Sequence, residues 1–472
     1  MRLTKIVATL GPTSNTVENI ERLAQLGVNV CRLNFSHGDY AAHGKVIDNI
    51  RTVNKRGYSL GIMLDTKGPE VRTGDVEKKI IIDIGDRVLF TSKKPEKETM
   101  KTVIVDYDKL ADDAPNARCI LIDNGAIEFR IEKITGHGVV AKALESGTIG
   151  SRRHVNLPGA HISLPSFTKK DWNDIRFGAE QQVDFIAASF VRTGDDVRKL
   201  KDFLHKNKSE AHVISKIETP QAVDNIDEII EASDGVMVAR GDLGSEVPFE
   251  DVPLMQDEIV AKCRLAAKPV IVATHMLESM VLGPMPTRAE VTDVAHAARL
   301  QADATMLSAE TANGKYPVKA VEAMSRILIR NERIDPHYDL LVTEAHGERI
   351  SMDAARRKQA LAASVLASEL QADAMIVISK HGRTARAVSN CRPLTPIHTF
   401  TEFPECQRQL MLVWGIVPHV IPFYENPEKT IEAAVALLKK EKYVQRGQRL
   451  VIVSDARAAK AQIMTIQMRQ VA

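Results

Sequence analysis

The 472-residue sequence has few of the features that mark specialised classes of protein. Its five cysteines lie far apart and include no C-x-x-C pair, which argues against a disulfide framework and against a structural zinc site. No stretch approaches the roughly 18 uncharged apolar residues that a membrane-spanning helix needs. The apolar run near the N-terminus breaks at Gly11-Pro12, too early for a signal peptide. These absences predict a cytoplasmic protein that has no membrane partner.

An excess of charge of one sign is also missing. Lys and Arg number 63 against 61 Asp and Glu, so the net charge of +2 leaves no basic surface for bulk nucleic-acid binding. Aromatic residues make up 4% of the chain and hydrophobic residues 44%, a composition that predicts aliphatic cores and excludes disorder. The length predicts about three domains, or one large barrel and a smaller unit.

Short β-branched runs recur along the chain with room for a helix between most of them. Helical patterns fill these gaps, as in VENIERLAQL after the first run. Eight such units predict a parallel (β/α)8 TIM barrel. The eight runs are 4–11, 27–35, 60–65, 183–190, 211–218, 235–242, 268–275 and 302–310.

One gap between these runs is too long for a single crossover helix. It contains strand-like pieces and Gly/Asp turns, which predict a small inserted β-barrel domain over 70–158. The insert could be a lid over the active face, or a decoration without function. The barrel then comprises 1–69 and 159–344, and a new strand and helix alternation predicts a C-terminal α/β domain over 345–472.

Polar residues gather where the predicted barrel strands end, which is where active sites of this architecture lie. Arg32, Asn34 and Ser36 share one face if the second strand stays extended, and Lys216 and Glu218 share a face at the end of the fifth. Each group alone could be a structural ion pair at the rim, and so could Arg240 with Asp242. Charge at four strand ends together favours a functional site.

The residue types at this mouth suit phosphoryl transfer. Glu218 and Asp242 offer hard oxygen ligands, so Mg²⁺ or Mn²⁺ is the expected metal. Arg32 and Lys216 add fixed positive charge for a phosphorylated anion, and Gly241 lets backbone N–H groups approach it closely. A divalent ion, an Arg and a Lys around one anion are the groups that phosphoryl transfer uses.

Two nucleotide-binding signatures are excluded. The sequence has no G-x-x-x-x-G-K-[ST] loop, so any nucleotide binds without a P-loop. A loose dinucleotide fingerprint at 136–141 lies in the β-rich insert with no helical pattern after it, and we interpret it as a hairpin turn.

Seven motifs, in order along the chain, resemble those of the pyruvate kinase family. The resemblance covers the barrel and the insert and, more weakly, the C-terminal domain, and it implies a three-domain enzyme that is usually a homotetramer. It implies transfer of the phosphoryl group of phosphoenolpyruvate to ADP, which gives pyruvate and ATP in glycolysis. The motifs are NFSHG (34–38), LDTKGPEVRTG (64–74), HVNLPG (154–159), ISKIET (214–219), MVARGDLG (237–244), ATHMLESM (273–280) and PTRAEVTDVA (286–295).

The resemblance also assigns roles to single residues. Lys216 and Arg32 would hold the phosphoryl group, and Glu218 and Asp242 would ligate Mg²⁺ or Mn²⁺. The backbone of 241–242 and the Thr274 hydroxyl would seat the substrate carboxylate. Lys216 and the metal would stabilise the enolate, and a proton would reach the methylene carbon along a path involving Thr274.

Monovalent-ion and nucleotide sites follow from the same resemblance. Glu70 is the residue type that accompanies a K⁺ requirement in this family, so we predict activation by K⁺. The K⁺ ligands would be Asn34, Ser36, Asp65 and Thr66. The nucleotide-binding residues would be Asn34, His37, Arg72 and Arg153. Arg153 stands where the family usually has Lys, which keeps the charge and alters its geometry.

A segment of the C-terminal domain predicts an effector site. Residues 379–384 follow a strand and precede a helix, which suits a phosphate cradle, although a turn with incidental polar residues is the alternative. The tail lacks the Gly-rich loop that often closes over fructose 1,6-bisphosphate in the family, so a sugar monophosphate or AMP is equally consistent. The cradle residues are Ser379, Lys380, His381, Gly382, Arg383 and Thr384.

Two other functions fit parts of the pattern. A lyase of the phosphoenolpyruvate/pyruvate barrel class would share the metal carboxylates but has no need for the insert or for Arg72. A silent binding protein on the same fold would have no reason to keep Arg32, Lys216, Glu218 and Asp242 together.

Overall fold

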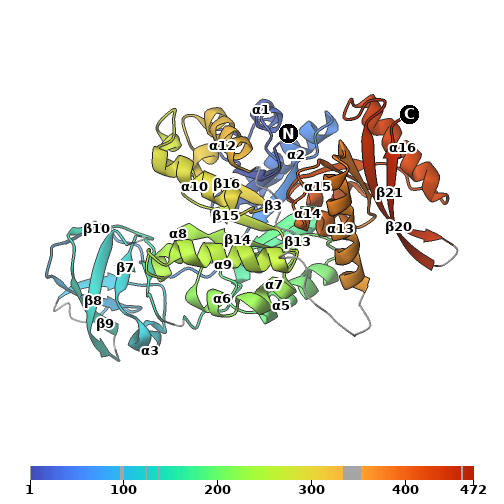
Figure 1. The fold of residues 1–472 in the computed structure, drawn as a ribbon. Helices are drawn as coiled ribbons and strands as arrows, with labels where there is room; N and C mark the ends of the chain where they lie inside the picture. The colour runs from blue at the N-terminus through green and yellow to red at the C-terminus, as the bar shows by residue number, and fades with distance from the viewer. Residues whose placement is uncertain are drawn as a thin grey trace.

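The architecture was obtained as a computed structural model, which describes residues 2–95, 100–123, 125–136, 138–160, 162–332, 352–458 and 461–472. Within these residues the chain forms a central barrel, a β insert at one end of it and an α/β domain at the other (Figure 1). No helix of the described residues is long and apolar enough to span a bilayer.

Eight parallel strands close the barrel in the order β1-β16-β15-β14-β13-β12-β3-β2. Each strand overlaps one of the eight runs predicted from the sequence, so the (β/α)8 barrel is confirmed. The strands are buried on both faces, as a parallel sheet covered by helices requires. They are β1 (Lys5–Thr9), β2 (Val30–Asn34), β3 (Gly61–Asp65), β12 (Phe185–Ala188), β13 (His212–Ile217), β14 (Gly235–Ala239), β15 (Val270–Ala273) and β16 (Ala304–Leu307).

The helices around the barrel begin at capping residues that the sequence supplies. Thr168, Thr193 and Thr287 each form a capping box with the acidic residue three positions later, which satisfies free N–H groups of the first turn. These helices are α1 (Val17–Gln25), α2 (Tyr40–Lys55), α4 (Lys169–Glu180), α5 (Gly194–Lys206), α6 (Pro220–Asp224), α7 (Ile226–Ala232), α8 (Arg240–Glu246), α9 (Val252–Leu265), α10 (Arg288–Arg299), α11 (Ala309–Ala312) and α12 (Pro317–Asn331).

The segment between β3 and α4 is a β domain with its own apolar core. Its six-stranded sheet has the order β11-β7-β8-β9-β5-β6, and β10 pairs with β4 separately, so the insert is a half-barrel with open edges where a small closed barrel was expected. Thr135 pairs with Gly138 across the β8–β9 connection, which confirms the predicted hairpin. The elements are β4 (Ile80–Ile82), β5 (Arg87–Thr91), β6 (Lys101–Ile104), α3 (Leu110–Asp113), β7 (Ile120–Ile122), β8 (Ile127–Thr135), β9 (Gly138–Ala143), β10 (Gly147–Ile149) and β11 (Val155–Asn156).

The C-terminal domain is a five-stranded sheet of order β19-β18-β17-β20-β21, flanked by helices. Four parallel strands match the predicted alternation, and β21 pairs antiparallel to β20, a strand that the sequence pattern did not indicate. The elements are α13 (Met352–Glu369), β17 (Ala374–Ile378), α14 (Arg383–Asn390), β18 (Ile397–Thr401), α15 (Pro404–Leu410), β19 (Ile416–Val420), α16 (Pro427–Lys440), β20 (Arg449–Ala458) and β21 (Ala461–Gln470).

This domain closes the end of the barrel at which the strands begin. Leu412 packs among the side chains inside the barrel. Asp303, just before β16, accepts hydrogen bonds from Arg392 at 2.9 Å and from the Trp414 backbone N–H at 3.0 Å. Asp184, just before β12, pairs with Arg408 of α15. The opposite end of the barrel, where the strands finish, is the mouth, and it is on the side of the insert.

Candidate active site at the barrel mouth

Lys216 lies in the mouth, where it is hydrogen-bonded to the ends of the neighbouring strands β3 and β12 and paired with Glu218 at the end of its own strand. Its Nζ donates to the Ser189 hydroxyl at 2.6 Å and to Asp65 Oδ1 at 3.1 Å, and it lies 2.8 Å from Glu218 Oε1. Strand periodicity explains the pairing with Glu218, because Glu218 lies one residue beyond the end of β13 and two residues from Lys216, and so continues the alternation of the strand. Only about a tenth of the Lys216 side chain is exposed, so the ammonium is held rigidly in a largely desolvated position.

Arg32 adds a second fixed cation beside the first. Its Nε donates to Asp65 Oδ2 at 2.6 Å and its Nη1 to the Thr9 hydroxyl at 3.0 Å. Asp65 is therefore shared by two cations, one on each carboxylate oxygen. Burial disfavours the Asp65 carboxylate, but Arg32 and Lys216 outweigh burial and hold its pKa below the ordinary value.

The same balance sets the charge state of the other groups at this mouth. Burial disfavours the Lys216 ammonium, but Asp65 and Glu218 outweigh it and raise the pKa of Lys216. For Glu218, burial raises the pKa, Lys216 opposes this effect, and the charge of Asp242 adds to it. The repulsion between these two carboxylate charges is what a bound cation would relieve.

Glu218 and Asp242 fit a hard divalent cation. Glu218 is fully buried, and one of its oxygens, Oε2, accepts from the Phe190 N–H at 2.7 Å. The other, Oε1, is within ion-pair distance of Lys216 but has no donor in hydrogen-bond geometry. Mg²⁺ is commonly held by one or two carboxylates together with substrate oxygens and water. Among the described residues no group of three or more His, Cys, Asp or Glu could hold a metal, so the protein itself offers these two carboxylates.

Thr274 and Gly241 meet beside this cluster. The Gly241 N–H donates to the Thr274 hydroxyl at 3.2 Å, and a Cβ at position 241 would lie 3.0 Å from the Thr274 methyl carbon, so the approach depends on glycine. Thr274 has φ +69° and His275 φ +54°, conformations that are strained for residues other than glycine. Strain of this kind persists only where neighbouring groups hold it.

Arg240 is the group that holds this strained turn. It donates to the Thr274 carbonyl at 2.6 Å and to the Ala273 carbonyl at 3.1 Å, and it forms a two-pronged ion pair with Asp293 of α10 at 2.6 and 2.7 Å. The alternative of an Arg240–Asp242 ion pair is therefore wrong, because the guanidinium is occupied by Asp293 and two carbonyl groups.

The residues expected to bind K⁺ lie at the ends of β2 and β3. Asn34 and Asp65 are direct neighbours across these strands. The second strand ends at Asn34, so Ser36 lies in a turn, where its N–H donates to Asn34 Oδ1 at 3.1 Å; the extended continuation to Ser36 was wrong. Thr66 accepts from the Ser189 N–H at 3.0 Å. The four ligands named from the sequence therefore come from the ends of two adjacent strands and the residues just after them.

The residues expected to bind nucleotide are distributed over the barrel and the insert. His37 is exposed in the turn after β2, and its carbonyl accepts from the His43 ring. Arg72 lies where the insert begins and donates to Glu70 at 2.7 Å and to the Arg152 carbonyl at 2.7 Å. Arg153 pairs with Asp123 at 3.1 Å within the insert. These cations are engaged inside the insert, and a ligand would compete for them.

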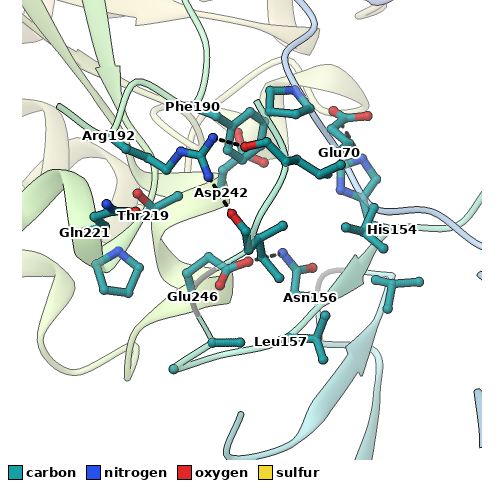
Figure 2. A pocket seen from close by; sticks show the side chains of 18 of the residues that line it. Glu70, His154, Asn156, Leu157, Phe190, Arg192, Thr219, Gln221, Asp242 and Glu246 are labelled. Carbon is teal, nitrogen blue, oxygen red and sulfur yellow. Dashed lines mark hydrogen bonds and ion pairs between the residues drawn. The ribbon is translucent and has the colours of Figure 1, made fainter. Parts of the chain in front are cut away.

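A cavity of about 200 Å³ separates the insert from the mouth (Figure 2). Asp242 and Phe190 line its barrel side, and Glu246 of α8 accepts a hydrogen bond from Asn156 of β11 at 2.7 Å across it. Burial raises the pKa of Glu246 to about 7. The insert thus faces the mouth and is tied to it, which favours a lid over a decoration.

Four residues of the site were not predicted from the sequence: Ser189, Asp293, Asn156 and Glu246. Ser189 directly follows the fourth barrel strand, so its position at a strand end is the local signal that indicates it. The other three act through contacts between separate elements, for which the sequence carries no local signal.

The predicted effector residues form a turn at the start of α14. Gly382 caps the helix with φ +73°, a conformation that favours glycine. Ser379 is buried and bonded to Phe400, and the Lys380 ammonium pairs with Glu402 at 2.6 Å and lies over the Phe403 ring, on which the His381 ring stacks. Arg383 and Thr384 begin the helix. The six residues are thus contiguous at one helix N-terminus.

Comparisons with known proteins point to a single family. The family described as "Pyruvate kinase, barrel domain" matches residues 1–321, and "Pyruvate kinase, alpha/beta domain" matches 358–466. A pyruvate kinase of Bacillus licheniformis is 43% identical over 97% of this chain and 78% of its own length. One of Dictyostelium discoideum is 41% identical over 96% of this chain and 90% of its own. The crystal structure of a Cryptosporidium parvum pyruvate kinase superposes with a TM-score of 0.92 at 37% identity, covering 99% of this chain and 96% of that one.

Proposed function

The chain belongs to the pyruvate kinase family and is a phosphotransferase that moves the phosphoryl group of phosphoenolpyruvate to ADP, and we propose that the cluster around Lys216 performs this transfer. The observation that carries the proposal is the Lys216 ammonium, bonded to Ser189 and Asp65 and paired with Glu218, beside the Arg32 guanidinium. Two immobile cations in a desolvated cleft provide charge where a phosphoryl group would pass.

In this mechanism Arg32 and Lys216 orient the phosphoryl group. Their carboxylate partners fix both cations before substrate arrives, so little reorganisation accompanies the transfer. Glu218 and Asp242 would hold Mg²⁺ or Mn²⁺, which when bound supplies further charge neutralisation at the phosphoryl oxygens. Lys216 then stabilises the enolate oxygen that remains after the phosphoryl group has left.

The turn at Thr274 would bind the carboxylate end of the substrate. The Gly241 N–H now donates to the Thr274 hydroxyl, and a bound carboxylate would take this N–H together with the Asp242 N–H and the Thr274 O–H. The strained backbone of Thr274 holds the hydroxyl in place. A proton would reach the enolate methylene carbon along a path that includes the Thr274 hydroxyl. We further propose that the insert excludes water by closing over this site, using the tie between Asn156 and Glu246.

Other sites are proposed from the family resemblance and from their positions. K⁺ would bind Asn34, Ser36, Asp65 and Thr66, and ADP would bind Asn34, His37, Arg72 and Arg153 after Arg72 and Arg153 leave their present partners. A phosphorylated effector would bind residues 379–384. We also propose the domain limits given above, a homotetramer and a cytoplasmic location.

The test is Lys216→Met, which removes the charge and keeps most of the side-chain volume. Pyruvate formation from phosphoenolpyruvate should require ADP and Mg²⁺ in the wild type. It should fall about a hundred- to a thousandfold in the variant, as for removal of a group that stabilises transition-state charge. Lys201→Met is the matched control, because Lys201 also pairs with an aspartate, Asp234 at 2.8 Å, which lies before the start of β14 and away from the mouth. Lys216→Met activity within tenfold of wild type would refute the proposed site.

A further inference from the structure

A second cavity, of about 680 Å³, lies where the barrel meets the C-terminal domain, at the end of the barrel away from the mouth. It is bounded by the end of α2 with the following loop, by the end of α4 and by α15. Its size falls within the range of small-molecule sites in proteins. It is lined by Arg51, Asn54, Lys55, Tyr58, Ser59, Ile62, Glu180, Gln181, Gln182, Pro404, Gln407 and Arg408.

Several hydrogen-bond donors in the lining are uncommitted. Arg408 uses only its Nε, which donates to Asp184 at 2.8 Å, so both of its Nη groups lack a partner among the described residues. Within the residues that the structure describes, the Lys55 ammonium and the Ser59 hydroxyl make no hydrogen bond or ion pair. Arg408 and Ser59 are half-buried, and half-buried donors are normally paired, so free ones beside the exposed Lys55 ammonium suit an acceptor-rich ligand.

The charge of the lining has the sign that an anion needs. Arg51, Lys55 and Arg408 contribute three cations, against Glu180 on the wall and Asp184 behind it. Asp184 is fully buried and bonded to Arg408 and to the Ile62 N–H at 2.8 Å, so it orients the guanidinium and is not itself exposed to a ligand. Arg51 is fixed by its hydrogen bond to the Gln181 carbonyl. The free end of a guanidinium beside an ammonium is a common phosphate-binding arrangement.

We propose that this junction cavity binds a phosphate monoester of a sugar-sized metabolite, with its phosphate between the Arg408 Nη groups and the Lys55 ammonium. The site is separate from the barrel mouth and from the cradle at 379–384. Binding there does not depend on the proposed catalytic roles, but an effect of binding on catalysis rests on the proposed function.

Contacts of α15 connect the cavity to both other sites. Leu410 and Cys406 pack against Gly382 of the cradle, at 3.1 and 3.4 Å from where a Cβ would stand. Through Asp184, Arg408 also contacts the first residues of β3, the strand that ends at Asp65. A ligand that holds Arg408 would therefore bias an element in contact with the cradle and with the catalytic barrel.

The test is competition between ligand and chemical labelling at single lysines of the full chain. The protein is treated briefly with acetic anhydride, with glucose 6-phosphate or inorganic phosphate present or absent, and acetylation is measured by peptide mass spectrometry. Lys55 should react about tenfold more slowly at about ten times the Kd of the ligand, because only the free fraction reacts. Lys45 is the matched control, since it is also exposed on α2, about 15 Å away along the helix.

A second variant tests the geometry. Arg408→Lys keeps the charge and the pairing with Asp184 but removes the Nη groups, so it should abolish most of the protection of Lys55. Protection of Lys380 without protection of Lys55 would overturn the cavity proposal and support the cradle instead. Equal protection of Lys45 and Lys55, or no protection of Lys55 by either phosphate compound at millimolar concentration, would also overturn it. Loss of pyruvate formation in Lys216→Met bears on the catalytic site alone.

Discussion

The ion pair between Arg240 and Asp293 should control the affinity of the active site without touching the substrate. Arg240 holds the carbonyl groups of Ala273 and Thr274, and Asp293 of α10 fixes Arg240 with two hydrogen bonds of 2.6 and 2.7 Å. Asp293→Asn keeps the shape of the side chain but turns one acceptor oxygen into an NH₂ group that faces a guanidinium N–H. One hydrogen bond is lost and a donor opposes a donor, so Arg240 is no longer fixed.

The size of the effect follows from the exposure of the pair and from the strain it supports. A hydrogen bond between charged groups contributes about 1.5–3 kcal/mol, and the side chains of Arg240 and Asp293 are 14% and 30% exposed, so we take the lower half of that range. The positive φ of Thr274 costs a similar ~1–3 kcal/mol, and the loss of its support should let the turn relax. At about 1.4 kcal/mol per tenfold, kcat/KM for phosphoenolpyruvate should fall about 10- to 50-fold.

Steady-state kinetics with each substrate varied separately provide the assay. The loss should fall mainly on KM for phosphoenolpyruvate, because the turn is proposed to seat its carboxylate, while KM for ADP stays close to the wild-type value. Asp257→Asn is the control, since Asp257 pairs with His296 of the same helix α10 on the surface. A KM for phosphoenolpyruvate within twofold of wild type, or an equal rise in both KM values, would refute the reasoning.

Three further outcomes are expected. Burial raises the pKa of Asp184 from its ordinary 3.8 to about 6. Between these pH values the folded protein holds a proton on Asp184 that the unfolded chain has released. The free energy of unfolding should therefore fall by ~3 kcal/mol as the pH rises from about 4 to 6. Asp184→Asn should lack that fall in urea unfolding, and parallel curves for both proteins would contradict it. Gly382 has φ +73°, so Gly382→Ala should strain the cradle by ~1 kcal/mol or more. The effector concentration that gives half-maximal activation should rise severalfold. An unchanged dose-response curve would argue against the cradle. Activity should be low in buffer free of K⁺ and NH₄⁺, as Glu70 predicts, and full activity there would disprove the K⁺ site.

The barrel strands and several mouth residues could be predicted because their signals are local. A β-branched run bounded by turns specifies a strand, and alternation along the strand places Lys216 and Glu218 on one face. The same reasoning was wrong where the chain leaves the strand, since Ser36 lies in a turn beyond Asn34. It also missed β21, whose sequence mixes polar and apolar residues and becomes a strand through pairing with β20.

The sequence by itself determined the order of the barrel strands and the residues at their ends, because periodicity and turn chemistry act over a few residues. Only the tertiary structure decided which of these residues meet. Ser189 reaches Lys216 across 27 positions, and Asp293 reaches Arg240 across 53. It likewise formed the cavity between α2, α4 and α15, whose cations come from two domains. Such contacts depend on how the closed barrel and the C-terminal domain pack together, and no local pattern in the chain encodes that packing.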